Sequence, residues 1–187
     1  MSIQVINEDK KIGIVSDYNQ TWISKARKLG GKWNGDRKAW FFDNKKQDVV
    51  DEALKEVFGE SPFSDEEVER VDIKIKGIDF IKNNTIQVGT IVVASRRSRD
   101  VPVQLKNDAY VTSGDFPSRG GSAAYPCCEP NEEVEMIVPN FPVSILSKID
   151  KALYTIIDDE VKQQDELIRE KKKLEKRLAE IDLLLAI

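Results

Sequence analysis

The sequence predicts an α+β protein with a small N-terminal ββαββα domain, a mostly-β middle domain and a long C-terminal helix that forms a coiled coil. Three observations predict this class. Residues 1–60 mix strand-like and helix-like apolar spacing, residues 71–140 show mainly strand-like alternation, and the chain after residue 142 contains no Gly or Pro. The 187 residues, of which 40% are hydrophobic, suffice for one medium domain or two small ones.

Two hairpins and two helices are expected in the first 60 residues. The segments "IQVI" and "KIGIVS" flank the polar turn "NEDK", which predicts a β-hairpin. Asn19 or Thr21 is a suitable N-cap for a helix, and Gly30-Gly31 ends this helix because glycine tolerates the left-handed cap conformation. Asn34-Gly35 predicts a tight turn before the strand "KAWFF", and a second helix follows over about 47–58.

An acidic segment with a proline, "GESPFSDEEVER" (59–70), separates this domain from the middle one. The strand candidates "VDIKIKG", "TIQVGTIVVAS", "VPVQLKNDAYVTS" and "VEMIVP" indicate a small barrel or a curled sheet over 71–140. Residues 113–133 are rich in Gly, Ser and Pro, so we expect a long exposed loop, a kind of segment that often carries function.

The C-terminal residues 142–187 are expected to form one helix of roughly 60 Å, at about 1.5 Å per residue. Its apolar residues fall at two heptad positions, which polar residues interrupt. Such a stripe needs a second copy, the rest of its own chain or a partner to cover it. We favour a homodimer, and packing against its own chain is the alternative. The residues expected at the dimer contact are Leu153, Ile157, Leu167, Leu174, Leu178, Ile181 and Leu185.

Composition excludes several kinds of chemistry. The chain has no histidine, so the commonest general base and metal ligand is missing. Cys127 and Cys128 are adjacent and lack the spacing of a zinc site, which favours two reduced loop thiols over a redox pair. No P-loop or nucleophile-elbow motif is present. We therefore expect no enzymatic activity, no cofactor and no metal.

One carboxylate cluster distantly resembles a magnesium-dependent nuclease site but fits no nuclease spacing well. Its members are Asp65, Glu66, Glu67, Asp72 and Lys74. No apolar run approaches the roughly 20 residues of a membrane span, and the N-terminus lacks the apolar region of a signal peptide. We expect a cytoplasmic protein without membrane contact.

Positive charge is concentrated in one stretch of this acidic chain, whose net charge is −4. Between residues 20 and 46, only Asp36 and Asp43 oppose the basic residues, which are Lys25, Arg27, Lys28, Lys32, Arg37, Lys38, Lys45 and Lys46. Basic side chains beside Trp33 and Trp40 are typical of surfaces that stack bases and contact phosphates. Both tryptophans are equally compatible with a core role under the first helix.

A second basic group lies at the tip "SRRSRD". Three arginines on a turn between strands are suited to phosphate, which arginine binds bidentately; a plain exposed turn is the alternative. The complete set of residues expected to contact nucleic acid is Lys28, Lys32, Trp33, Arg37, Lys38, Trp40, Arg96, Arg97 and Arg99.

The order of hairpin, helix, "GGKW", tight turn and "KAWFF" resembles the HARP-type domain and its small relatives in proteins of phages and conjugative elements. The residues that carry the resemblance are Gly30, Gly31, Lys32, Trp33, Lys38, Trp40 and Phe42. The resemblance covers residues 1–60 and implies binding to forked or single-stranded DNA. This chain has no helicase motor, so only the binding role is implied.

These observations predict a non-enzymatic nucleic-acid-binding protein of a phage or mobile element that acts as a homodimer, with DNA favoured over RNA. An alternative is an inhibitor that blocks a host defence or nucleic-acid-processing protein, using the acidic segments "SDEEVE" and "EPNEEVE" to occupy its nucleic-acid groove. A third is a scaffold role for the C-terminal helix alone.

Overall fold

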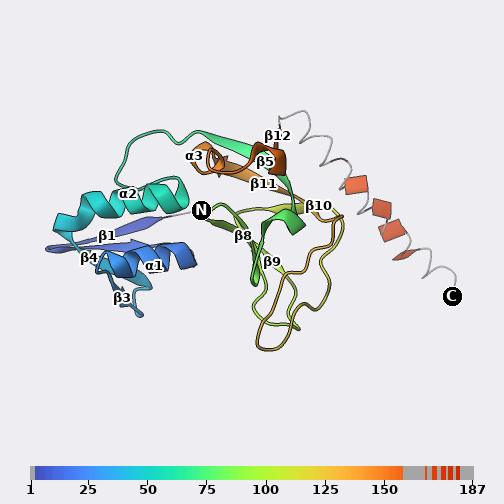
Figure 1. Cartoon of the computed structure of the whole chain (residues 1–187), viewed down its shortest axis with the longest axis horizontal. Helices are drawn as coiled ribbons and strands as arrows, with labels where there is room; N and C mark the ends of the chain where they lie inside the picture. Colours follow the sequence, from blue (N-terminus) through green and yellow to red (C-terminus); the bar gives the residue numbers. More distant parts are fainter. Residues whose placement is uncertain are drawn as a thin grey trace.

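The structure, a computed structural model, describes residues 3–157 and nine residues between positions 167 and 181. The described residues form three four-stranded antiparallel sheets connected by short helices. The predicted fold class is therefore wrong: no continuous helix covers 142–187, and strands dominate the described chain. Figure 1 shows α1, α2 and the first sheet at one end, with β5 and β8–β12 beyond them.

The first sheet has the strand order β1-β2-β4-β3 and carries both longer helices on one face. Its strands are β1 (Gln4–Glu8), β2 (Lys11–Val15), β3 (Lys32–Asn34) and β4 (Ala39–Asp43), and its helices are α1 (Gln20–Lys28) and α2 (Gln47–Phe58). The hairpin β1-β2 and the hairpin β3-β4 are both present, so these local predictions are confirmed. A 3₁₀ turn, Asn44–Lys46, leads into α2.

Alternation along β2 and β4 determines which side chains the helices cover. Ile12, Ile14, Trp40 and Phe42 share the helix face because they occupy alternate, paired positions of the two strands. They pack against Trp22 of α1 and a buried row of α2, which consists of Val50, Ala53, Leu54, Val57 and Phe58. The opposite face carries Phe41 directly over Gly13, where an added Cβ would lie 2.8 Å from the phenyl ring.

Residues 70–157 form the other two sheets. One has the order β10-β11-β5-β12, from Tyr110–Ser113, Glu135–Pro142, Arg70–Lys76 and Tyr154–Ile157. The other has the order β6-β7-β8-β9, from Ile81–Lys82, Thr85–Val88, Ile91–Ser95 and Gln104–Leu105. A 3₁₀ turn, Gly77–Phe80, connects β5 to β6, and the two sheets share one apolar core in which Ile73, Ile86, Val93 and Met136 are fully buried.

Polar contacts at the ends of α1 and α2 join the two halves of the molecule. Asn19 is 4% exposed: its side-chain oxygen accepts from the Trp22 amide to cap α1, and its Nδ2 donates to the Thr90 carbonyl at 2.7 Å. The Thr90 hydroxyl donates to the carbonyl of Val57 at 2.6 Å. Gly59 ends α2 with φ 75° and lies against Pro142. Asn19, one of the two expected caps, is thus also the link between the halves.

The segment expected to begin the long helix instead forms three short elements. Helix α3 covers only Val143–Leu146, a 3₁₀ turn covers Lys151–Leu153, and Tyr154–Ile157 is strand β12, paired with β5. The sequence "YTII" is aromatic and β-branched, so it has a strand preference that the edge of β5 satisfies with backbone hydrogen bonds.

The residues predicted for the dimer contact do not all lie on a helix. Leu153 lies in the 3₁₀ turn and Ile157 in β12, where it is 6% exposed, so neither is on a helical seam. Leu167, Leu174, Leu178 and Ile181 have helical backbone and are exposed, while Leu185 lies outside the described residues.

Candidate nucleic-acid interface

The two tryptophans of the β3-β4 hairpin have different environments. They pair directly across the strands, so both point to the helix face, and their ring centroids are 5.6 Å apart. Trp40, on the inner strand, is 7% exposed and belongs to the core. Trp33, on edge strand β3, is 53% exposed. Trp40 therefore has the core role that was one of the two alternatives, whereas Trp33 offers a free indole face supported by a buried one.

Cations of the last turn of α1 lie at the same end of the helix face. The Arg27 guanidinium carbon is 6.0 Å from the centroid of the Trp40 ring, within the range of a cation–π contact. Lys28 follows it and is exposed. We call Arg27, Lys28, Trp33 and Trp40 the Trp33 surface.

The other basic residues predicted for this site lie elsewhere on the hairpin. Lys32 pairs with Phe41, so alternation places it on the face opposite Trp33. The Arg37 guanidinium forms an ion pair of 2.9 Å with Glu8, which lies on that opposite face by register. Lys38 is exposed in the turn with φ 51°, and the Asn34 side chain closes the turn by accepting from the Arg37 amide at 3.0 Å. The hairpin therefore divides the predicted cluster between its two sides.

Arg96 is not a phosphate contact. It is 0% exposed, and its guanidinium donates to the carbonyl oxygens of Val101 at 2.7 Å, Ser118 at 3.1 Å and Pro117 at 2.6 Å. These acceptors lie in two irregular segments that are distant from each other in the sequence. Arg96 therefore fastens them together, which the local "SRRSRD" pattern could not indicate.

The remaining arginines of this tip differ from each other. Arg99 is bound by Asp100 at 3.0 Å, and the same carboxylate accepts from Arg119 at 3.2 Å. The hydrogen bond from Arg99 lowers the pKa of Asp100, and this one carboxylate offsets part of the charge of the two arginines. Arg97 is exposed and lines a groove against α1.

This groove, which the sequence did not predict, runs between α1 and the β6-β9 sheet and has a volume of about 680 Å³. We call it the α1 groove. Four cationic residues line it, and three of them are exposed and come from separate segments: Lys82, Arg97 and Lys106. No carboxylate is among its lining residues in the described chain. The other lining residues are Tyr18, Gln20, Thr21, Ser24, Asn83, Asn84, Thr85, Gln87, Val92, Ser95 and Arg96.

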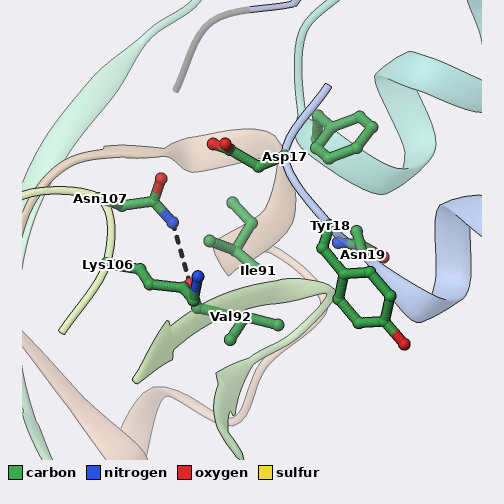
Figure 2. Close-up of a pocket in the computed structure, with 8 residues that line it drawn as sticks. Asp17, Tyr18, Asn19, Ile91, Val92, Lys106 and Asn107 are labelled. Carbon is green, nitrogen blue, oxygen red and sulfur yellow. Dashed lines mark hydrogen bonds between the residues drawn. The ribbon is translucent and has the colours of Figure 1, made fainter. Parts of the chain in front are cut away.

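Hydrogen bonds hold the walls of the α1 groove in place. The Asn84 side chain donates to the Arg96 carbonyl at 3.1 Å, and the Arg96 amide donates back to the Asn84 carbonyl at 2.9 Å. Asn107 donates to the Val92 carbonyl at 2.9 Å, which holds the Lys106 segment against β8 (Figure 2). The bond from Asn19 to Thr90 fixes α1 to the sheet. These walls do not have to be assembled by a ligand.

A smaller pocket of about 250 Å³ adjoins the α1 groove and shares Tyr18, Val92 and Lys106 with it. Figure 2 shows Tyr18 on the side of this pocket opposite Lys106 and Asn107. The Tyr18 side chain is 73% exposed and its hydroxyl donates to Gln20 at 2.9 Å. An exposed aromatic ring thus stands where the groove and this pocket meet.

The carboxylate cluster does not assemble as a site. Glu66 contacts Lys55 at 3.4 Å, whereas Lys74 pairs with Glu135 at 2.9 Å on the β5-β11 ladder. Asp72 accepts from the Asn140 amide. Among the described residues, no three side chains of the metal-binding types come together as ligands for an ion.

The two cysteines also differ. Cys128 is 0% exposed and contacts the Asn84 carbonyl, and burial raises the pKa of its thiol to about 11. Cys127 is partly exposed, and both thiols are free. Cys128 and the buried Gly120 also show that the 113–133 segment, expected to be a long exposed loop, is anchored in part to the core.

Within the described part of the chain, no helix has both the length and the apolar character to cross a membrane. Comparison with protein-family models, with curated proteins and with solved structures found no match to this chain.

Proposed function

We propose that this protein binds single-stranded nucleic acid, DNA in the first instance, without catalysing a reaction on it. One observation carries the proposal: Trp33 is half exposed on an edge strand, and its ring is held against Trp40 beside the cationic end of α1. An indole in this position offers a face to a base, and Arg27 and Lys28 are available to phosphates.

The energetics favour a single strand over a duplex. Stacking of one base on an aromatic side chain contributes about 1–3 kcal/mol and depends little on which base is stacked. Bases in a duplex are already stacked on their neighbours, so they are not free to cover Trp33. Because Trp33 is supported by Trp40, little side-chain freedom is lost when a base binds.

The test replaces Trp33 by Ala and by Phe and measures binding of a fluorescent oligothymidylate by anisotropy. We expect Trp33→Ala to weaken binding by about 5- to 150-fold, the equivalent of one stacked base, and Trp33→Phe to retain most of the affinity. Tyr125→Ala is the matched control, since Tyr125 is 81% exposed on another part of the surface. Parental affinity in Trp33→Ala contradicts the proposed stacking site.

The same assay with duplex DNA and with RNA of equal length defines the ligand. We expect the single strand to bind more tightly than the duplex at each salt concentration. Tighter binding of the duplex contradicts the stacking mechanism, because stacking needs an unpaired base.

The inhibitor alternative and the HARP-type resemblance stay predictions. The acidic segments named for an inhibitor are partly engaged within the chain: Glu66 contacts Lys55, Glu135 pairs with Lys74, and Glu129 accepts from the Gly121 amide. This engagement favours nucleic-acid binding over mimicry of a nucleic acid. We also propose that the protein acts in the cytoplasm of the cell that makes it.

A homodimer likewise stays a prediction. Exposed Leu167, Leu174, Leu178 and Ile181 are the described residues available for it. Sedimentation of a variant with these four residues replaced by Ser tests it, because loss of a parental dimer is the expected outcome.

A further inference from the structure

We infer that the α1 groove holds the sugar-phosphate backbone of a single strand whose base stacks on Trp33. This inference rests on the proposed function and adds a second binding site to it. The ligand class is a phosphodiester chain without its complementary strand.

The positive charge of the groove is the first observation in favour of this ligand. Lys82, Arg97 and Lys106 converge from three segments, and within the described chain none of them forms an ion pair. Arg37 and Arg99, by contrast, are paired with Glu8 and Asp100. Three unbalanced cations facing one groove attract a polyanion.

The neutral lining suits the same ligand. The side-chain amides of Gln20 and Asn83 are donors for phosphate and sugar oxygens. The hydroxyls of Ser24 and Thr85 donate instead to backbone carbonyls of their own segments. Contacts from the two amides hold a backbone without reading its sequence. Tyr18 adds an exposed ring at the edge of the groove, where a further base can stack.

Helix α1 connects the groove to the Trp33 surface. Gln20, Ser24 and Arg27 are spaced i, i+4 and i+7, so they share one exposed face of the helix. Gln20 and Ser24 line the groove, and Arg27 lies about 4.5 Å further along the helix axis than Ser24. The Arg27 guanidinium carbon is 6.0 Å from the Trp40 ring centroid, and the Trp40 and Trp33 ring centroids are 5.6 Å apart. One strand can therefore contact both sites along one continuous surface.

The groove is also prepared in advance. The bond from Asn19 to Thr90 joins its two sides, and the paired bonds between Asn84 and Arg96 hold the sheet side in place. Binding therefore costs little rearrangement of the protein.

The test is the salt dependence of binding to an oligothymidylate of about 16 nucleotides, the upper end of the range that one single-strand-binding fold covers. The groove variant is Lys82→Gln, Arg97→Gln and Lys106→Gln together. The matched control is Lys10→Gln, Lys11→Gln and Lys151→Gln, three exposed lysines that do not line the groove. All six side chains are exposed, so we expect unchanged urea midpoints.

We expect the groove variant to lower the slope of log affinity against log salt by about 2, because each neutralised phosphate contributes about 0.7 for a single strand. We expect its affinity at 0.1 M salt to fall by about tenfold or more, whereas the control keeps the parental slope. Equal slopes in groove and control variants overturn the inference.

The Trp33→Ala variant separates the two proposals. If it weakens binding while the groove variant does not, the proposed function stands and the groove assignment is wrong. If only the groove variant weakens binding, the groove is the site and Trp33 is not. If the parent protein fails to bind the oligonucleotide at low salt, both proposals are wrong.

Discussion

Replacement of Arg96 by Met is expected to be among the most destabilising single changes in this protein. Met has a similar reach but no donors, so it removes all the hydrogen bonds to Val101, Ser118 and Pro117. Three carbonyl oxygens in part-buried hydrogen bonds then lose their charged partner. Each such bond contributes roughly 1.5 kcal/mol, and loss of the buried charge offsets part of the total, so we expect a loss of about 3–5 kcal/mol in the free energy of unfolding.

Urea unfolding gives the free energy, and hydrogen exchange gives the place where the structure loosens. We expect the amides of residues 97–121 to lose protection first, because Arg96 joins these segments. Arg97→Met is the matched control: its side chain is exposed, so its effect should stay within about 0.5 kcal/mol. If Arg96→Met unfolds at the same urea concentration as Arg97→Met, the clamp role of Arg96 is refuted.

Three further changes test other contacts. Asn19→Ala should lower the free energy of unfolding in urea by about 2 kcal/mol, since it removes the cap of α1 and the hydrogen bond to Thr90. Asn19→Asp keeps the cap and should lower it less; equal losses would contradict a separate contribution from the cap. Iodoacetamide at pH 8 should label Cys127 and spare Cys128, because burial raises the pKa of Cys128 to about 11; mass spectrometry after brief labelling checks which cysteine is modified. The free energy of unfolding should fall as pH rises from about 9 to about 11, because the Cys128 thiol ionises in the unfolded chain and not in the folded one. Gly13→Ala should cost about 1–3 kcal/mol because its Cβ would lie 2.8 Å from Phe41, and Phe41→Leu added to it should recover part of this loss in thermal unfolding.

Local signals predicted the first 60 residues well. Asn34 ends β3 and Gly35 begins the turn to β4, and Asn19 caps α1, because turn and cap chemistry acts within three or four residues. The C-terminal prediction failed for the opposite reason. The chain from Tyr154 lacks Gly and Pro, yet it pairs with β5, which is about 80 residues earlier, and only its β-branched residues hinted at a strand.

The candidate site shows the same limit. Trp33 was identified from its basic and aromatic neighbours, but its exposure follows from the edge position of β3, which the sheet order determines. Arg96 and Arg97 are adjacent in sequence, and one is buried while the other faces the groove. The groove itself joins α1 to Lys82 and Lys106, and no local pattern links residues so far apart.

The pairing of β12 with β5 affects how this chain can be shortened. A cut before Tyr154 removes β12 and leaves the outer row of β5 amides and carbonyls, from Asp72 to Ile75, without a neighbour. An uncovered strand edge of this kind recruits strands from other chains, which leads to intermolecular β-sheet growth. Shortened chains should therefore end after Ile157, where the sheet is complete, so that self-association caused by an open edge is not mistaken for a property of the C-terminal segment.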